Sequence, residues 1–150
     1  MVRWAEFAAA EPDLAGAVAA RLRAHRHHTL ATLRRDGSPR VSGIEVELGG
    51  GELRLGMMAG SRKALDLRRD PRLALHTGSD DPPEGDPAGW PGDAKISGVG
   101  VEEPAGDPEA GHRFRVDLRE VSFVRVGPPG DHLVVDSWVV GRGRRRDVRR

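Results

Sequence analysis

Tight turns that flank segments of alternating polarity constrain this fold more than any other sequence feature. Asp36-Gly37 is a strong signal for a two-residue hairpin, and Gly49-Gly50-Gly51 marks a second turn. Between the turns, residues 41–48 carry apolar and charged side chains at a period of two, which is typical of a strand with one buried face. Residues 53–57 repeat this period. We therefore predict antiparallel strands that are joined by short turns.

Other short apolar segments predict further strands. They span Thr29 to Leu33, Leu73 to Thr77, Ala94 to Val101, Val121 to Val126 and Leu133 to Val140. Helical spacing predicts a short helix at Trp4 and Phe7, a second helix capped by Asp13, and a short helix within residues 107–118. The elements predict a mainly β protein, a small antiparallel barrel of six or seven strands with helices at its edges. Such a barrel is filled by its own side chains, so a sizeable ligand must bind outside it or between subunits.

The composition bounds the class of protein. At 150 residues the chain is long enough for one domain, and we expect residues 1–150 to form it, with 141–150 as a basic tail. The absence of cysteine excludes disulfides and thiolate chemistry. No apolar run is long enough to span a membrane, and the N-terminus does not resemble a signal peptide. We therefore expect a cytoplasmic protein without a membrane partner. Residues 78–92 predict a long surface loop that covers a ligand or moves.

A strand-to-helix junction is the strongest candidate for a binding site. A strand-like run ends at Gly60, and Ser61 is a good N-cap for the helix that follows. Arg62 and Lys63 then place two cations in the first turn, where the helix dipole is also positive. An anion bound by the exposed N–H groups and both side chains would make this charge arrangement favourable. A solvent-exposed helix that begins with two basic residues is the alternative.

Common catalytic motifs are absent from the sequence. It contains no G-x-S-x-G elbow, no phosphate-binding P-loop and no dinucleotide-binding G-x-G-x-x-G between a strand and a helix. His25, His27 and His28 form a cluster near a predicted helix end, where cationic histidines are mildly favourable, and we predict a structural or surface role for them. His76 alternates out of a strand and faces either a pocket or solvent. We therefore assign no catalytic residue and no metal ligand.

Two segments resemble a known family. Residues 36–43 (DGSPRVSG) and 60–72 (GSRKALDLRRDPR) closely resemble the pyridoxamine 5′-phosphate oxidase-like, FMN-binding split barrels. The resemblance is strong over residues 30–75 and weaker at 93–98 and around Trp138. It implies a split β-barrel with N-terminal and crossover helices. It also implies a flavin-dependent oxidoreductase that transfers hydride between bound FMN and a small organic substrate.

The resemblance also implies a set of cofactor-binding residues. The phosphate would be bound by Ser61, Arg62 and Lys63, and the flavin ring would lie along the main chain of the strand after the first turn. A tryptophan from the second subunit of a homodimer would reach the ring, with the cofactor at the subunit interface. The implied set is Arg40, Val41, Ser42, Gly43, Met57, Met58, Ser61, Arg62, Lys63 and Trp138.

Departures from the family pattern limit which reactions can be expected of this chain. The true vitamin oxidases use a tyrosine and an Arg-x-His element to bind their substrate, whereas this chain has no tyrosine and no histidine after Trp138. The pyridoxamine phosphate oxidase reaction is therefore not expected. We predict FMN as the cofactor. Coenzyme F420 is the alternative, because the acidic tail of F420 would suit the many arginines.

Two other classes of function remain open from the sequence. One is a flavin carrier or sensor without turnover, because flavin chemistry needs no dedicated acid or base from the protein. The other is nucleic-acid binding by the arginines of 142–150, which we do not favour because no aromatic residues are interleaved with them.

Overall fold

The computed structural model describes residues 1–150, with the side chain of Pro108 excepted. It contains three α-helices, eight strands and two 3₁₀ helices. The helices are α1 (Trp4–Ala10), α2 (Pro12–Ala24) and α3 (Arg62–Arg69), with 3₁₀ turns at Pro87–Gly89 and Pro108–Ala110. The strands are β1 (His27–Leu33), β2 (Pro39–Gly49), β3 (Glu52–Met57), β4 (Arg72–His76), β5 (Asp93–Glu103), β6 (His112–Gly127), β7 (His132–Val139) and β8 (Gly143–Arg149).

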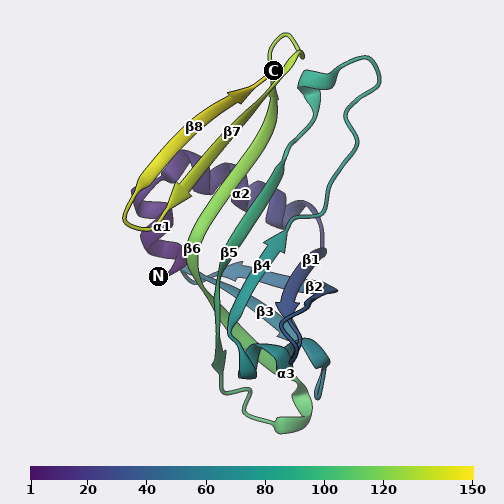
Figure 1. Ribbon diagram of the computed structural model, residues 1–150, viewed down its shortest axis with the longest axis vertical. Helices are drawn as coiled ribbons and strands as arrows, with labels where there is room; N and C mark the ends of the chain where they lie inside the picture. The colour runs from purple at the N-terminus through teal and green to yellow at the C-terminus, as the bar shows by residue number, and fades with distance from the viewer.

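The strands form one antiparallel sheet that closes on itself. Their order is β3-β2-β1-β4-β5-β6-β7-β8, and an additional pairing of β3 with β6 closes six of them into a barrel. Strands β7 and β8 extend the sheet beyond the barrel (Figure 1). The mainly β fold and the antiparallel barrel predicted from the sequence are therefore confirmed.

The long strand β6 divides the barrel from the extension. Its first residues pair with β3, from Met57 opposite His112 to Arg54 opposite Arg115, and its last residues pair with β7. Strand β5 follows β6 along most of its length, and their register shifts between Ser97 and Gly98. A Cβ at Gly98 would collide with the carbonyl oxygen of Asp117, so glycine allows this close approach. The bulge lies between the part of β6 that pairs with β3 and the part that pairs with β7.

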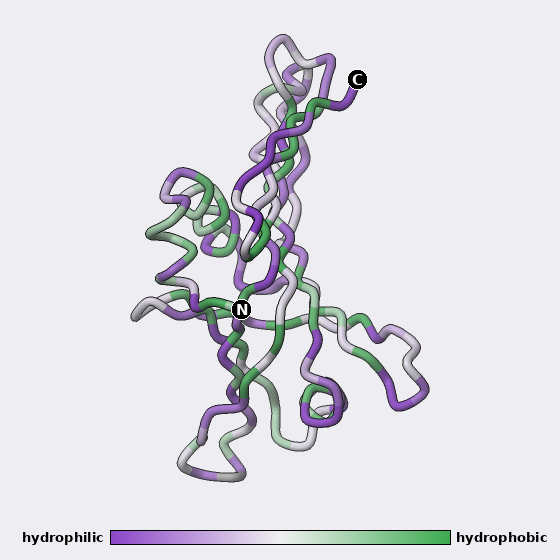
Figure 2. Tube along the Cα trace, turned by 60° about the vertical axis from the view of Figure 1, so that its left-hand side comes forward, coloured by the Kyte–Doolittle hydropathy of each residue, from purple (hydrophilic) through white to green (hydrophobic). Residues whose placement is uncertain are grey.

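Three sequence predictions need correction. Residues 107–118 contain only a 3₁₀ turn, and most of the segment belongs to β6. The helix α2 has Glu11 as its N-cap and Pro12 in its first turn, so Asp13 lies inside the helix. The predicted basic tail contains β8, which pairs with β7 from Gly143 to Arg149. Figure 2 shows how hydrophilic this last segment is, which explains why no apolar period revealed the strand.

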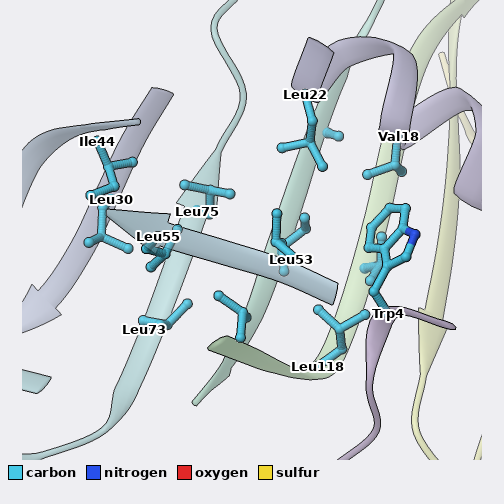
Figure 3. Packing of buried hydrophobic residues seen from close by; sticks show 14 of the residues in the cluster. Trp4, Val18, Leu22, Leu30, Ile44, Leu53, Leu55, Leu73, Leu75 and Leu118 are labelled. Atoms are coloured by element: carbon cyan, nitrogen blue, oxygen red, sulfur yellow. The ribbon is translucent and has the colours of Figure 1, made fainter. Parts of the chain in front are cut away.

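The core fills the barrel and continues beneath the N-terminal helices. Within the barrel, Leu30, Leu55 and Leu75 are at most 3% exposed (Figure 3). Leu14, Val18 and Leu22 recur at a spacing of four on α2, which places them on one buried face of the helix. The interior therefore leaves no room for a large ligand. None of the helices in the described chain has the length and apolarity needed to cross a membrane.

Candidate functional site

The N-terminus of α3 presents unpaired hydrogen-bond donors. Ser61 caps the helix, and its Oγ accepts a hydrogen bond from the backbone N–H of Ala64 at 3.4 Å. The backbone N–H groups of Arg62 and Lys63 have no acceptor among the described residues. Gly60 precedes the cap with a φ of +69°, a left-handed conformation that glycine adopts without strain. Gly60 thus forms part of the turn that leads from β3 into α3.

The two cations in the first turn of α3 have different surroundings. The guanidinium of Arg62 is exposed, and no described residue forms a hydrogen bond or ion pair with it. The Nζ of Lys63 donates a hydrogen bond to the carbonyl oxygen of Gly43 at 2.8 Å. This bond connects the start of α3 to β2, so two segments predicted to contact the same cofactor do lie side by side. A Cβ at Gly43 would meet no atom within 4 Å, so β2 is open there.

A buried carboxylate fixes α3 against the barrel. Asp66 is 3% exposed, and it accepts hydrogen bonds from Thr32 at 2.8 Å and from Arg40 at 2.7 Å. Arg69, one turn further along α3, donates to its second oxygen at 2.9 Å. Burial disfavours the charge on Asp66, but the hydrogen bonds from Arg40, Thr32 and Arg69 outweigh burial and lower the pKa. Arg40 is thus oriented by α3.

The outer side of α3 borders a pocket of about 650 Å³ that is dominated by arginine. Its lining residues are Arg35, Arg40, Arg62, Leu65, Asp66, Arg68 and Arg69. Asp66 neutralises part of this charge, and Arg68 forms a two-point ion pair with Glu102, at 2.7 and 2.8 Å. Arg35 and Arg62 have no acidic partner among the described residues. The pocket therefore retains positive charge and favours an anion.

The predicted site residues fall into two groups. Arg40 to Gly43, Met58 and Ser61 to Lys63 lie around the start of α3, where Val41 is 70% and Met58 83% exposed. The side chain of Met57 instead belongs to the core and is 6% exposed. Trp138 lies apart from the others. It is 7% exposed, and its ring packs 4.9 Å from that of Phe7.

Sequence reasoning missed two residues that organise this region. Asp66 occupies an apolar position on α3 between Ala64 and Leu67, and a carboxylate in such a place requires partners, which is a signal that the sequence did contain. His112 accepts a hydrogen bond from the backbone N–H of Gly60 at 3.0 Å. No sequence pattern connects these two positions, because only barrel closure brings them together.

The remaining histidines and the long loop lie elsewhere. His28 is buried and bonds to the backbone of Leu22 and Gly78, while His25 contacts Asp80 at 3.0 Å. The described residues contain no group of three acidic or histidine side chains that could bind a metal. The loop 78–92 leaves the barrel at the end opposite α3 (Figure 1), so within one chain it does not cover this site.

His76 faces a second pocket, on the outer surface of the sheet. This pocket measures about 310 Å³ and lies over β1, β4, β5 and β6. Its polar residues include His76, Lys95 and Glu120, and small apolar side chains such as Ala31 and Ala74 form its floor. Ala31 is paired with Val41 of β2, so the pocket adjoins the strand that carries the predicted cofactor contacts.

The fold and the site define a class of protein: a split β-barrel whose polar site lies outside the barrel, at the tip of a crossover helix. Residues 14–134 match the model of the family described as pyridoxamine 5′-phosphate oxidase. Because this match covers most of the chain, the protein belongs to that family. A search of curated proteins gave no match.

Solved structures share the fold at low sequence identity. PhzG from Burkholderia lata 383, in complex with tetrahydrophenazine-1-carboxylic acid, is 13% identical, with a TM-score of 0.67 over 95% of this chain and 91% of its own. A pyridoxamine 5′-phosphate oxidase-related, FMN-binding protein from Nostoc punctiforme is 12% identical, with a TM-score of 0.61 over 93% and 96%. A heme-binding protein from Mycobacterium smegmatis is 24% identical, with a TM-score of 0.54 over 82% and 57%. These identities establish the shared fold alone.

Proposed function

We propose that this protein is a flavin-dependent oxidoreductase that binds FMN at the start of α3. The observation that carries the proposal is a set of donors at one helix tip. Two free N–H groups and the exposed guanidinium of Arg62 have no partner among the described residues, and the ammonium of Lys63, which donates one hydrogen bond to Gly43, lies nearby. The doubly charged phosphate of FMN matches these donors in charge and in hydrogen-bonding capacity. The residues that are present therefore fit the cofactor that the family implies.

The main chain of β2 would hold the ring system. Gly43 offers backbone without a side chain, and the exposed Val41 offers an apolar surface beside it. Asp66 bonds to Arg40, and Lys63 bonds to Gly43, so β2 is held at two positions before any ligand binds. Preorganisation of this kind lowers the entropic cost of binding.

The protein's own residues would mainly bind and orient. A bound flavin supplies the hydride acceptor, so the chain needs no catalytic acid or base. We propose that a small substrate enters the pocket of about 310 Å³ next to β2, with its apolar part against Ala31 and Ala74 and its polar groups toward His76 and Lys95. The sequence contains no tyrosine, so this substrate site differs from that of the vitamin oxidases.

Coenzyme F420 is the second candidate cofactor, and the arginine-lined pocket favours it. F420 carries a longer acidic tail than FMN, and the pocket that Arg35, Arg40 and Arg62 line extends from the helix tip along the outer side of α3. A tail with several carboxylates would find cationic partners there. Comparing the affinities for FMN and F420 in the wild type and in Arg35→Ala separates the two, since the loss of Arg35 weakens F420 binding selectively.

A homodimer is part of the proposal. Val41, Met58 and Leu65 are large apolar side chains that remain 48–83% exposed around the site. A second subunit would cover them and close the cofactor site from the other side. Because Trp138 packs against Phe7 within its own chain, its proposed contact with a partner's flavin requires that this ring leave the core or act through its exposed edge.

Substitution of Arg62 tests the phosphate site. Arg62→Ala removes a charge-assisted bond of roughly 1.5–3 kcal/mol, so we expect the dissociation constant of FMN to rise about tenfold or more. Arg23→Ala is the matched control, because Arg23 is an exposed arginine on α2 that forms no ion pair with the described residues. Isothermal titration of both variants with FMN decides the matter. Equal affinities in the wild type and in Arg62→Ala would refute the site.

A reduction assay separates the oxidoreductase from a flavin carrier. The FMN-loaded protein is mixed with NADPH or NADH under nitrogen, and bleaching of the flavin absorbance is followed. Bleaching that is faster than with free FMN supports the oxidoreductase. Saturable binding without bleaching by any physiological reductant favours the carrier.

A further inference from the structure

The imidazole of His112 holds the turn that precedes α3. The backbone N–H of Gly60 donates to Nε2 of His112 at 3.0 Å. A backbone N–H can only donate, so Nε2 must carry a lone pair and the proton of the neutral ring must lie on Nδ1. Nδ1 in turn lies 3.2 Å from Oε1 of Glu102, to which it donates. The contacts thus define one tautomer of a neutral histidine.

Barrel closure places His112 next to this turn. His112 is opposite Met57 at the end of the β3–β6 pairing, directly before the residues that lead into α3. Gly111 has a φ of +103°, and a Cβ there would collide with the carbonyl oxygen of Met57. The start of β6 therefore lies directly against the end of β3, which a side chain at position 111 would prevent. The ring of His112, whose side chain is 12% exposed, has little freedom of its own.

His112 is connected to α3 at two points. It bonds directly to Gly60, before the helix, and through Glu102 it is connected to Arg68, within the helix. The guanidinium of Arg68 holds the pKa of Glu102 at about 2, so this carboxylate remains charged at every pH at which histidine titrates. Glu102 therefore fixes the orientation of the ring throughout.

We propose that His112 is a positioning residue for the phosphate site, and that its protonation weakens phosphate binding at the tip of α3. This inference rests on the proposed function. The neutral ring fixes Gly60 and, through it, the cap Ser61 and the free N–H groups that follow. In the protonated ring Nε2 carries a hydrogen, so two donors face each other and the bond to Gly60 is lost. The turn before α3 then loses its anchor.

Other charged groups surround the ring. They are Arg68 on α3, Glu102 and Glu103 on β5, Asp107 in the connecting loop, Arg113 on β6, Arg54 on β3 and Glu47 on β2. Two of these groups lie against Nδ1 of the ring: Oε1 of Glu102 at 3.2 Å and Nη2 of Arg68 at 3.3 Å.

Two substitutions separate positioning from bulk electrostatics. His112→Gln keeps a carbonyl oxygen that can accept the Gly60 N–H but cannot titrate, and His112→Leu removes the acceptor at every pH. FMN dissociation constants are measured from pH 5.5 to pH 8 for the three proteins. The phosphate also gains a proton near pH 6, and dividing the wild-type constant by that of His112→Gln cancels this effect.

We expect this ratio to rise about three- to tenfold from pH 8 to pH 5.5, which corresponds to the loss of one hydrogen bond. We also expect His112→Leu to bind FMN about three- to tenfold more weakly than the wild type at pH 8. A ratio that is constant with pH, or an unchanged affinity in His112→Leu, overturns the inference.

An NMR titration of the ligand-free protein distinguishes failure of this inference from failure of the proposed function. The ¹⁵N–¹H resonance of Gly60 should shift with the protonation of His112 in the wild type and should show no such step in His112→Gln. If the step is present but no flavin binds at any pH, the proposed function fails while the coupling of His112 to the turn stands. If flavin binds and Gly60 shows no step, the inference fails alone.

Discussion

At the scale of single residues, Asp66 is the side chain that connects the most elements around the site. It is a carboxylate with almost no contact with solvent, and three side chains from β1, β2 and α3 converge on it. Removal of one partner from a buried ion pair leaves the other charge uncompensated, which costs about 3–5 kcal/mol. We expect Asp66→Ala to lower the free energy of unfolding at pH 7 by about 3 kcal/mol, as measured by urea denaturation.

The pH dependence of this loss identifies its cause. The pKa of Asp66 in the folded protein lies below its ordinary value of 3.8, so its ionised form stabilises the fold above pH 3.8. That contribution disappears as the pH falls through the folded-state pKa, where the wild type also loses the charge. The difference between wild type and Asp66→Ala should therefore shrink below pH 3.8. A constant difference would assign the effect to packing alone.

Residue-scale predictions from the sequence succeeded where the signal was local. Ser61 caps α3 as predicted, because a serine before a helical period offers its hydroxyl to the first turn whatever surrounds it. The partners of Asp66 and the contact between His112 and Gly60 depend on strands far apart in the chain. The packing of Trp138 against Phe7 belongs to the same class, since it requires α1 to lie on the sheet extension.

At the scale of elements, the first half of β6 and the whole of β8 were not predicted. Residues 113–118 alternate charged and apolar side chains, and Phe114, Val116 and Leu118 are at most 1% exposed, so a period-two signal was present there. The sequence prediction nevertheless placed a short helix within residues 107–118. In β8 no such signal exists, because arginines occupy both faces of the strand.

The two faces of β8 have different environments. Arg146 donates to the buried Asp136 of β7 at 2.8 and 3.1 Å, and Arg144 approaches the same carboxylate at 3.2 Å. On the other face, the one partner of Arg145 among the described side chains is Asp147 of its own strand, and the Arg145 side chain is 77% exposed. A true basic tail would show no such difference between neighbouring arginines.

A pair of double substitutions tests whether β8 is a strand. Arg144→Ala with Arg146→Ala leaves Asp136 buried and unpaired, so we expect the free energy of unfolding to fall by about 3 kcal/mol. Arg145→Ala with Arg149→Ala removes the same charge from the opposite face and should change it by less than about 0.5 kcal/mol. Thermal and urea unfolding of both variants provide the measurement. Equal effects would mean that residues 141–150 behave as a tail.

At the scale of the whole molecule, the filled barrel determines where function can lie. Because Leu30, Leu55 and Leu75 occupy the interior, both pockets lie on the outer surface: the arginine-lined pocket beside α3 and the pocket over β1, β4, β5 and β6. The strand count predicted the size of the barrel, and it therefore also predicted that any ligand site would lie outside the interior. The position of the 78–92 loop could not be predicted from the sequence, because it depends on β4 and β5, which place the loop at the end of the barrel opposite α3 (Figure 1).

The apolar residues around the site predict how the molecule associates. Val41 is 70% exposed, and Ala31 and Ala74 continue its apolar surface across β1 and β4. If a second copy covers this face, sedimentation velocity at micromolar concentration should give twice the chain mass of 16.2 kDa.

Val41→Glu would place a charge in the interface without touching the core, so we expect a shift toward monomer and weaker FMN binding. Val148→Glu, at a residue 54% exposed on β8, should leave both unchanged. A wild-type monomer that binds FMN tightly would contradict a site shared between subunits.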